Sequence, residues 1–239
     1  MKAKLILLCL LLVVFSICLT GCFDGKPDYS KQGVCIVENT SLRTEPSTKG
    51  KWSSSLALGE TVKLESGPIK DEADPKVEYI KVKLSDGTKG YASTWCIVRG
   101  AYVGVIQETS KIYKRPDLLA ESNQQYEIMN IVAVEEEKDS WIRVTGEGRS
   151  KSGWIQKESI RKDKEDVVTA VLLRKALRGK GNNIPREEME AIVSNLPYQD
   201  SYFVNHVMAK YEDDEVYEEE NTGEEVVEES MDSESVEEE

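Results

Sequence analysis

The clearest pattern in the chain is a series of short runs in which apolar and polar residues alternate. The run Tyr79–Leu84 alternates strictly, which is typical of a β-strand with one buried face. Asp86 and Gly87 follow it, and this dipeptide favours a tight hairpin turn. Other short β-like runs lie at 34–37, 41–47, 55–60, 61–64 and 90–98. The pattern therefore predicts a small all-β domain over residues 34–98.

The same order of runs occurs a second time, which indicates an internal repeat. The sequence Tyr-Ile-Lys-Val at 79–82 corresponds to Trp-Ile-Arg-Val at 141–144, and Gly-Tyr at 90–91 corresponds to Gly-Trp at 153–154. An isoleucine stands seven residues after each of these glycines, at positions 97 and 160. Short strands at regular spacing are typical of barrels or sandwiches, so a second domain is predicted over residues 101–161.

The spacing of apolar residues changes to a helical one over residues 164–210. A broad apolar face covers 167–173, and the glycines at 179 and 181 end it. Pro185 then suits the first turn of a second helix. That helix has apolar residues at i, i+3, i+4 and i+7, and the aromatic stretch 202–207 indicates a third. We expect this helical region to pack on the second β-domain.

The N-terminus has the pattern of an exported protein. Two lysines precede an apolar run over 5–19, which is too short for a membrane span of about 20 residues. A charged start followed by such a run predicts a signal peptide over residues 1–21. The sequence Leu-Thr-Gly-Cys at 19–22 resembles the lipobox of bacterial prolipoproteins, although an ordinary cleavage site beside a chance cysteine is the alternative.

The lipobox resemblance implies that Cys22 becomes the first residue and carries the lipid. Several acyl chains anchor a protein stably to a membrane. Residues 22–33 are then a polar tether. We expect a lipid-anchored protein of the cell envelope, in the outer membrane or at the cell surface, whose membrane contact is made through the N-terminal lipid.

The net charge of −13 comes from the C-terminal segment. Residues 211–239 carry 16 Asp or Glu and no Lys or Arg, whereas residues 22–210 carry 29 basic and 28 acidic side chains. The dense charge predicts a disordered acidic tail, either a solubilising brush or a region that captures basic partners or divalent cations. The balanced remainder has no basic field of the kind that binds nucleic acid, so no nucleic-acid partner is expected.

The cysteines and the single histidine limit the chemistry. After export and lipidation only Cys35 and Cys96 remain as thiols, and an oxidising compartment favours a disulfide between them, with two buried free thiols as the alternative. Together with His206 they do not fill the four ligands of a zinc site.

No catalytic residue is predicted. His206 lies in a helical stretch and is expected to be packed or half-exposed, while a Cys-His hydrolase needs a nucleophilic cysteine beside its histidine. The sequence has no phosphate-binding or dinucleotide-binding motif. We therefore expect no metal, no cofactor and no enzymatic activity.

The first repeat resembles the bacterial SH3 domain. The second copy is weaker, because Tyr113 replaces an arginine and no Gly-x-x-Val step precedes residues 131–134. The resemblance implies two tandem SH3-like barrels, followed by the helical region and the acidic tail. It also implies that the first and last strands of a barrel are neighbours, which would place Cys35 and Cys96 within bridging reach. The residues that carry the match in the first copy are Leu42, Arg43, Pro46, Gly59, Val62, Tyr79, Val82, Gly90 and Tyr91.

Trp52 and Trp95 are the candidate ligand-contact aromatics, because neither has a counterpart in the second copy. An exposed tryptophan can anchor a ligand, whereas a partly buried one would be structural. The layout also resembles the leptospiral Len (endostatin-like) lipoproteins, which implies surface display and binding of host laminin, fibronectin, plasminogen or complement regulators. A peptidoglycan-binding envelope protein and an accessory subunit of an envelope enzyme are the alternatives.

Overall fold

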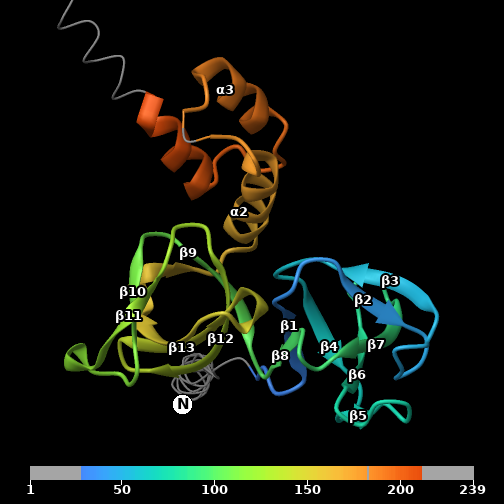
Figure 1. The fold of residues 1–239 in the computed structure, drawn as a ribbon. Helices are drawn as coiled ribbons and strands as arrows, with labels where there is room; N and C mark the ends of the chain where they lie inside the picture. The colour runs from blue at the N-terminus through green and yellow to red at the C-terminus, as the bar shows by residue number, and fades with distance from the viewer. Residues whose placement is uncertain (1–27, 182, 212–239) are drawn as a thin grey trace, which may run out of the picture.

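The computed structural model describes residues 28–181 and 183–211, which form two antiparallel β-sheets followed by helices (Figure 1). The mainly β fold expected from the alternating runs is thus confirmed. The expected signal peptide at 1–21, the lipidation of Cys22 and the acidic tail beyond Tyr211 lie outside the described residues.

The first sheet is built from residues 32–99. Its strand order is β3-β2-β7-β6-β4-β1-β8, and β5 pairs with β6. The strands are β1 (Gln32–Cys35), β2 (Thr40–Arg43), β3 (Trp52–Leu56), β4 (Thr61–Leu64), β5 (Ile69–Lys70), β6 (Glu78–Lys83), β7 (Lys89–Ser93) and β8 (Ile97–Arg99).

The second sheet is built from residues 102–161 and repeats this topology. Its order β11-β10-β14-β13-β12-β9-β15 matches the first sheet strand for strand. Its elements are β9 (Tyr102–Ile106), β10 (Ser110–Tyr113), η1 (Leu118–Ala120), β11 (Glu121–Tyr126), β12 (Ile131–Lys138), β13 (Trp141–Gly146), η2 (Glu147–Arg149), β14 (Ser152–Gln156), η3 (Lys157–Ser159) and β15 (Ile160–Arg161).

The repeat extends to individual hydrogen bonds and explains why the second copy looked weak in sequence. The Gly59 N–H donates to the Cys35 carbonyl at 2.8 Å, and the Met129 N–H donates to the Ile106 carbonyl at the same distance. Gly59 has φ of +78° and Met129 has φ of +64°. Met129 therefore adopts the left-handed backbone that glycine adopts more easily, and the missing glycine signal does not mean a missing turn.

Each sheet encloses its own core, because its inward-facing side chains alternate with outward-facing ones. The first core contains Cys35, Leu42, Leu56, Val62, Ile80, Val82, Leu84, Ala92 and Ile97. The second contains Tyr102, Ile106, Ile112, Tyr126, Val132, Val134, Ile142, Val144 and Ile155. A smaller cluster joins the two sheets and consists of Val34, Ile36, Val98, Ala101 and Ala133.

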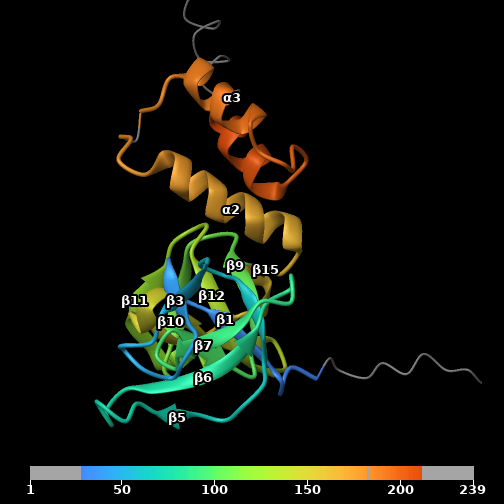
Figure 2. The ribbon, with the colours of Figure 1, turned by 90° about the vertical axis from the view of Figure 1, so that its right-hand side faces the viewer.

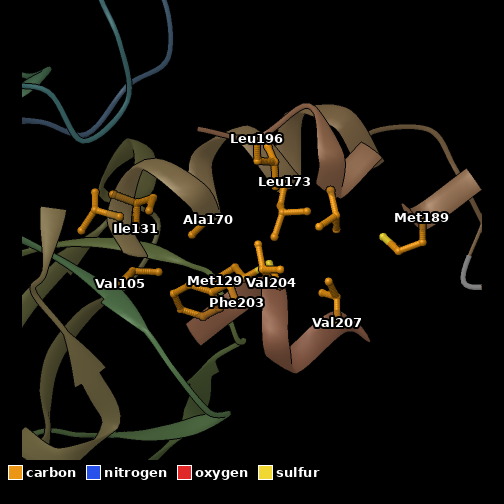
Figure 3. Packing of buried hydrophobic residues seen from close by; sticks show 12 residues of the cluster. Val105, Met129, Ile131, Ala170, Leu173, Met189, Leu196, Phe203, Val204 and Val207 are labelled. Carbon is orange, nitrogen blue, oxygen red and sulfur yellow. The ribbon is translucent and has the colours of Figure 1, made fainter. Parts of the chain in front are cut away.

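The helices pack on the second sheet, as Figures 1 and 2 show. They are α2 (Lys164–Leu177), α3 (Arg186–Ser194) and a helix over 202–211. Val105, Met129 and Ile131 form the sheet side of their shared core, and Figure 3 shows Phe203 and Leu173 packed within it. The helical side consists of Val167, Ala170, Leu173, Met189, Val193, Leu196, Phe203, Val204 and Val207.

Asp166 ties the last helix to α2 and to the second sheet. Its carboxylate accepts hydrogen bonds from Arg161, from the Ser201 hydroxyl at 2.8 Å and from the Tyr202 N–H at 2.9 Å. The Arg161 guanidinium also lies 4.8 Å from the centroid of the Tyr202 ring. Burial acts to raise the pKa of Asp166, but these hydrogen bonds and the charge of Arg161 outweigh it and hold the pKa below its ordinary value.

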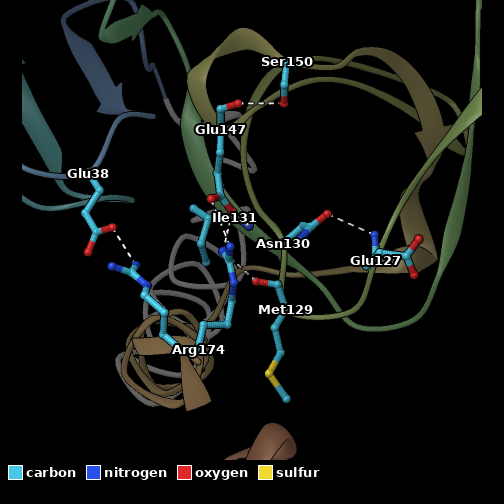
Figure 4. A network of polar contacts seen from close by, with 9 residues as sticks. Glu38, Glu127, Met129, Asn130, Ile131, Glu147, Ser150 and Arg174 are labelled. Atoms are coloured by element: carbon cyan, nitrogen blue, oxygen red, sulfur yellow. Dashed lines mark hydrogen bonds and ion pairs between the residues drawn. The ribbon is translucent and has the colours of Figure 1, made fainter. Parts of the chain in front are cut away.

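The turn η2 joins the two sheets and α2, and Figure 4 shows the contacts of Glu147 with Ile131 and Arg174. The Glu147 carboxylate accepts hydrogen bonds from the Ile131 N–H at 3.1 Å and from Arg174 Nη2 of α2 at 3.0 Å. The next residue, Gly148, donates its N–H to the Ile36 carbonyl of the first sheet at 2.7 Å. A second link to α2 is the ion pair between Glu38 and Arg178, at 2.7 Å.

We predict that Gly90→Ala and Gly153→Ala each destabilise the protein by about 1–3 kcal/mol, because overpacking forces the chain to shift. A Cβ at Gly90 would lie 2.5 Å from Leu42 Cγ, and one at Gly153 would lie 2.5 Å from Ile112 Cγ2. Gly67→Ala is the control, since nothing lies within 4 Å of its Cβ position. Urea unfolding checks this, and equal midpoints for all three variants would contradict it.

We predict that Asp166→Asn lowers the free energy of unfolding at neutral pH by about 1–3 kcal/mol, since it removes the charge that Arg161 faces. The folded-state pKa of Asp166 is lowered, so its contribution is present above the unfolded pKa of about 3.9 and is lost as the pH falls through the folded pKa. Urea unfolding as a function of pH measures this. The difference between wild type and variant should shrink in acid, and the exposed Asp163→Asn should show little effect at any pH.

Candidate functional site: a cleft beside the sheet junction

A cleft of about 1140 Å³ lies beside the junction of the two sheets. Most of its wall comes from the first sheet, and Glu135 and Arg149 come from the second. A volume of this size is at the upper end of ordinary ligand sites. The first sheet lines it with Leu64, Glu65, Ser66, Gly67, Pro68, Lys76, Val77, Glu78, Ile80, Ser93, Thr94, Trp95, Ile97, Val98, Arg99 and Gly100, and Ser30 and Lys31 precede that sheet.

Trp95 lies in the turn between β7 and β8 and lines this cleft. Its side chain is 54% exposed, so it is available to a ligand and is not the partly buried structural residue that the sequence left as the alternative. Its backbone is fixed from the second sheet, because Arg149 Nε donates to the Trp95 carbonyl at 2.9 Å. The same guanidinium donates to the Ile97 carbonyl at 3.1 Å and to the Thr94 carbonyl at 3.4 Å.

The wall of the cleft carries both signs of charge. Glu65 pairs with Lys89 at 2.7 Å, and this hydrogen-bonded lysine holds the pKa of Glu65 below its ordinary value. Lys76 and Arg99 form no ion pair with any described residue and are left for a ligand. The cleft thus offers one aromatic face, hydroxyl groups and charges of both signs, which suits a polypeptide segment.

Trp52 does not share this site. It begins β3, at the opposite end of the strand order from β8, and it is not among the residues that line the cleft. Trp52 lies between the β-like runs 41–47 and 55–60 that the sequence predicts, but it pairs with Arg43 of β2 and belongs to the edge strand β3. Its side chain is 66% exposed, and its Nε1–H donates to the Ser55 hydroxyl at 3.2 Å.

Cys35 and Cys96 are neighbours, as expected for the first and last strands of the unit, but both thiols are free. The Ile36 N–H donates to the Cys96 carbonyl at 3.0 Å, which brings the two segments together. The Cys35 thiol points into the first core and donates to the Val37 carbonyl at 3.2 Å, whereas Cys96 is a half-buried turn residue. Burial raises the pKa of the Cys35 thiol. The expected disulfide is thus not formed in this structure, and its formation in the exported protein stays a prediction.

His206 lies on the helix 202–211, half-buried, and stacks on Tyr202 with a centroid distance of 6.0 Å. Burial lowers its pKa, and the nearby charge of Lys210 adds to this effect. Both cysteines lie in the first sheet, so the helix does not bring the histidine to a thiol. None of the residues that line the cleft is a cysteine or a histidine.

The described residues contain no group of three or more His, Cys, Asp or Glu side chains arranged to hold a metal ion. Within the same residues, no helix has the length and apolar character needed to cross a bilayer.

Arg149 and the exposed pair Leu118 and Leu119 were not singled out from the sequence. Arg149 donates to the turn that carries Trp95, more than fifty residues away in the sequence. The only sequence signal for this contact was the position of Arg149 directly after a glycine in the tripeptide Glu-Gly-Arg. Leu118 and Leu119 were a stronger signal, because they are two adjacent large apolar side chains outside the alternating runs.

No protein-family model and no curated protein matches this chain. Among solved structures, NlpC2 from Trichomonas vaginalis is similar at 13% identity and a TM-score of 0.25, over 71% of this chain and 57% of that one. NlpC1 from the same organism is similar at 12% identity and a TM-score of 0.25, over 74% and 56%. The chain spans just over half the length of these proteins. A likeness at this level assigns neither a fold family nor an activity to the chain.

We predict that Arg149→Ala costs about 1 kcal/mol of stability and loosens the turn that carries Trp95, since three carbonyls lose a charged donor. Arg143→Ala is the control, because its exposed pair with Glu135 at 3.3 Å is worth less than about 1 kcal/mol. Urea unfolding gives the stability, and acrylamide quenching of tryptophan fluorescence reports the turn. Equal quenching in the two variants would contradict the role given to Arg149.

Proposed function

We propose that this chain is a lipid-anchored, non-catalytic binding protein of the bacterial cell envelope, in which two SH3-like barrels present a ligand cleft. The observation that carries the proposal is Trp95, an exposed aromatic side chain at the wall of the cleft, on a turn that Arg149 fixes. A large aromatic group on a fixed backbone binds with little loss of conformational entropy, which makes it a suitable anchor for a ligand.

A binding role fits the lining of the cleft better than catalysis does. A hydroxyl nucleophile needs a base beside it, and the Ser66 hydroxyl of the lining donates instead to the Gly67 carbonyl at 2.8 Å. The mixed charges of the cleft suit recognition of a polypeptide through several weak polar contacts around one aromatic residue.

For the ligand we propose a protein at the host surface, an extracellular-matrix protein or a complement regulator, in keeping with the resemblance to the Len lipoproteins. The unpaired cations Lys76 and Arg99 favour a ligand segment that contains acidic residues. Peptidoglycan is the second candidate, because its stem peptides carry both signs of charge, as this cleft does.

We predict that Trp95→Ala weakens binding to immobilised laminin or factor H by about 30-fold, the effect expected for a central aromatic anchor. Trp52→Ala removes a tryptophan that is more exposed than Trp95 but lies outside the cleft, and it should leave binding unchanged. Surface plasmon resonance with the full mature chain measures both. Equal losses in the two variants would exclude the cleft as the binding site.

Retention on purified sacculi distinguishes the two ligands. Retention that Trp95→Ala abolishes, without binding to either host protein, would replace the first candidate by peptidoglycan. Protease treatment of intact cells then tests the location, since a host-binding protein is digested from outside and a wall-binding one is protected.

A further inference from the structure

The loop 114–120 of the second unit presents two adjacent leucines to solvent. Leu118 is 66% exposed and Leu119 is 91% exposed. The loop that carries them is ordered by its own hydrogen bonds, because the Asp117 carboxylate accepts from the Leu119 N–H at 2.9 Å and from Arg115 Nη2 at 3.0 Å. The buried side chain of Ala120 closes the loop on the domain. The leucines are therefore held outward on a fixed backbone.

The fold itself does not require apolar residues at these positions. In the corresponding loop of the first unit the Ser47 N–H donates to the Glu45 carbonyl at 2.8 Å, as the Asp117 N–H donates to the Arg115 carbonyl at 2.8 Å. This equivalence places Thr48 and Lys49 where the second unit has its two leucines. The same backbone thus carries a polar pair in one copy and an apolar pair in the other, so the packing of the domain does not explain the two leucines.

The loop lies at the end of the second sheet opposite the helices. Tyr113, the last residue of β10 before the loop, packs edge-on against Trp141 with a centroid distance of 4.9 Å. Trp141 pairs with Lys138 at one end of the β12–β13 ladder. The other end of that ladder leads to Glu147, which contacts Arg174 of α2.

The N-terminal tether leaves the domain at the same end. Tyr29 packs on Tyr102 with a centroid distance of 5.0 Å. The Tyr102 hydroxyl donates to the Glu137 carboxylate at 2.5 Å, and Glu137 pairs with Ile142, next to Trp141. Tyr29 is only seven positions after Cys22, and seven extended steps of the chain span at most about 25 Å. A lipid on Cys22 therefore keeps this end of the second sheet close to the membrane.

We propose that Leu118 and Leu119 insert into the surface of the membrane that holds the lipid anchor. The inference rests on the proposed anchoring at Cys22, which sets the end of the protein that faces the bilayer. Aliphatic side chains at a lipid interface gain the free energy of leaving water. Lys114 is exposed, forms no ion pair among the described residues and belongs to the same loop, since its N–H donates to the Ala120 carbonyl at 2.9 Å; its charge suits anionic headgroups.

The test uses the mature chain with Cys22→Ser, which carries no lipid, and vesicles of phosphatidylcholine and phosphatidylglycerol. Leu118→Thr with Leu119→Lys copies the polar loop of the first unit and should weaken sedimentation with vesicles by about tenfold or more. The added positive charge would by itself strengthen binding to anionic vesicles, so a loss identifies the leucines. Ile69→Thr removes a different exposed apolar side chain and should change nothing.

A second readout follows the loop in the lipidated chain. The fluorescence of the Leu119→Trp variant should lie at shorter wavelength when the chain is bound to vesicles than when it is in detergent-free buffer. Lys49→Trp, at the equivalent position of the first unit, should show no such shift in its emission. Flotation of the lipidated chain with vesicles tests the anchor separately. If that chain floats and Leu119→Trp stays water-exposed, the leucine proposal is wrong and the anchor stands.

If the native chain carries no lipid, the proposed anchoring at Cys22 is wrong. Sedimentation of the Cys22→Ser chain with vesicles is then the measurement that tests the leucine proposal. Sedimentation with vesicles that Leu118→Thr with Leu119→Lys abolishes would then support the leucines as the membrane contact. Absence of sedimentation for every variant would overturn it.

Discussion

Three consecutive residues hold the parts of this protein in one arrangement. Glu147 contacts α2 through Arg174, Gly148 donates to the Ile36 carbonyl of the first sheet, and Arg149 donates to the turn that carries Trp95. The two sheets share only a small apolar cluster, so these polar contacts also fix their relative orientation. Gly148 and Arg149 both have positive φ, at 56° and 54°, which turns three neighbouring residues toward three different partners.

The duplicated architecture would let one chain combine the proposed ligand site with the proposed membrane contact. Each unit has a complete core of its own and the same strand order. Outward-facing positions are therefore free to differ between the copies without disturbing the scaffold. The first unit supplies most of the cleft around Trp95, while the second carries the leucine loop and the helices.

The sequence predicted the strands well because alternation reports directly which face of a strand is buried. The run 79–84 and the repeat Trp-Ile-Arg-Val at 141–144 correspond to the paired strands β6 and β13. Met129 shows a limit of sequence-based prediction. It adopts a left-handed backbone conformation, which only a glycine at this position would have indicated from the sequence. The cleft was harder to predict from the sequence than the strands. Trp95 stood out by its type, but its exposure and its fixed backbone depend on Arg149, which lies far away in sequence and becomes a neighbour only after folding.

The position of Arg149 also has a mechanical consequence. Under the proposed function, a ligand in the cleft would load the turn of Trp95, and the chain enters the fold through Tyr29, which packs on the second sheet. Arg149 of the second sheet donates to three carbonyls around that turn, so such a load would reach the second sheet through these hydrogen bonds as well as passing along the backbone of the first sheet.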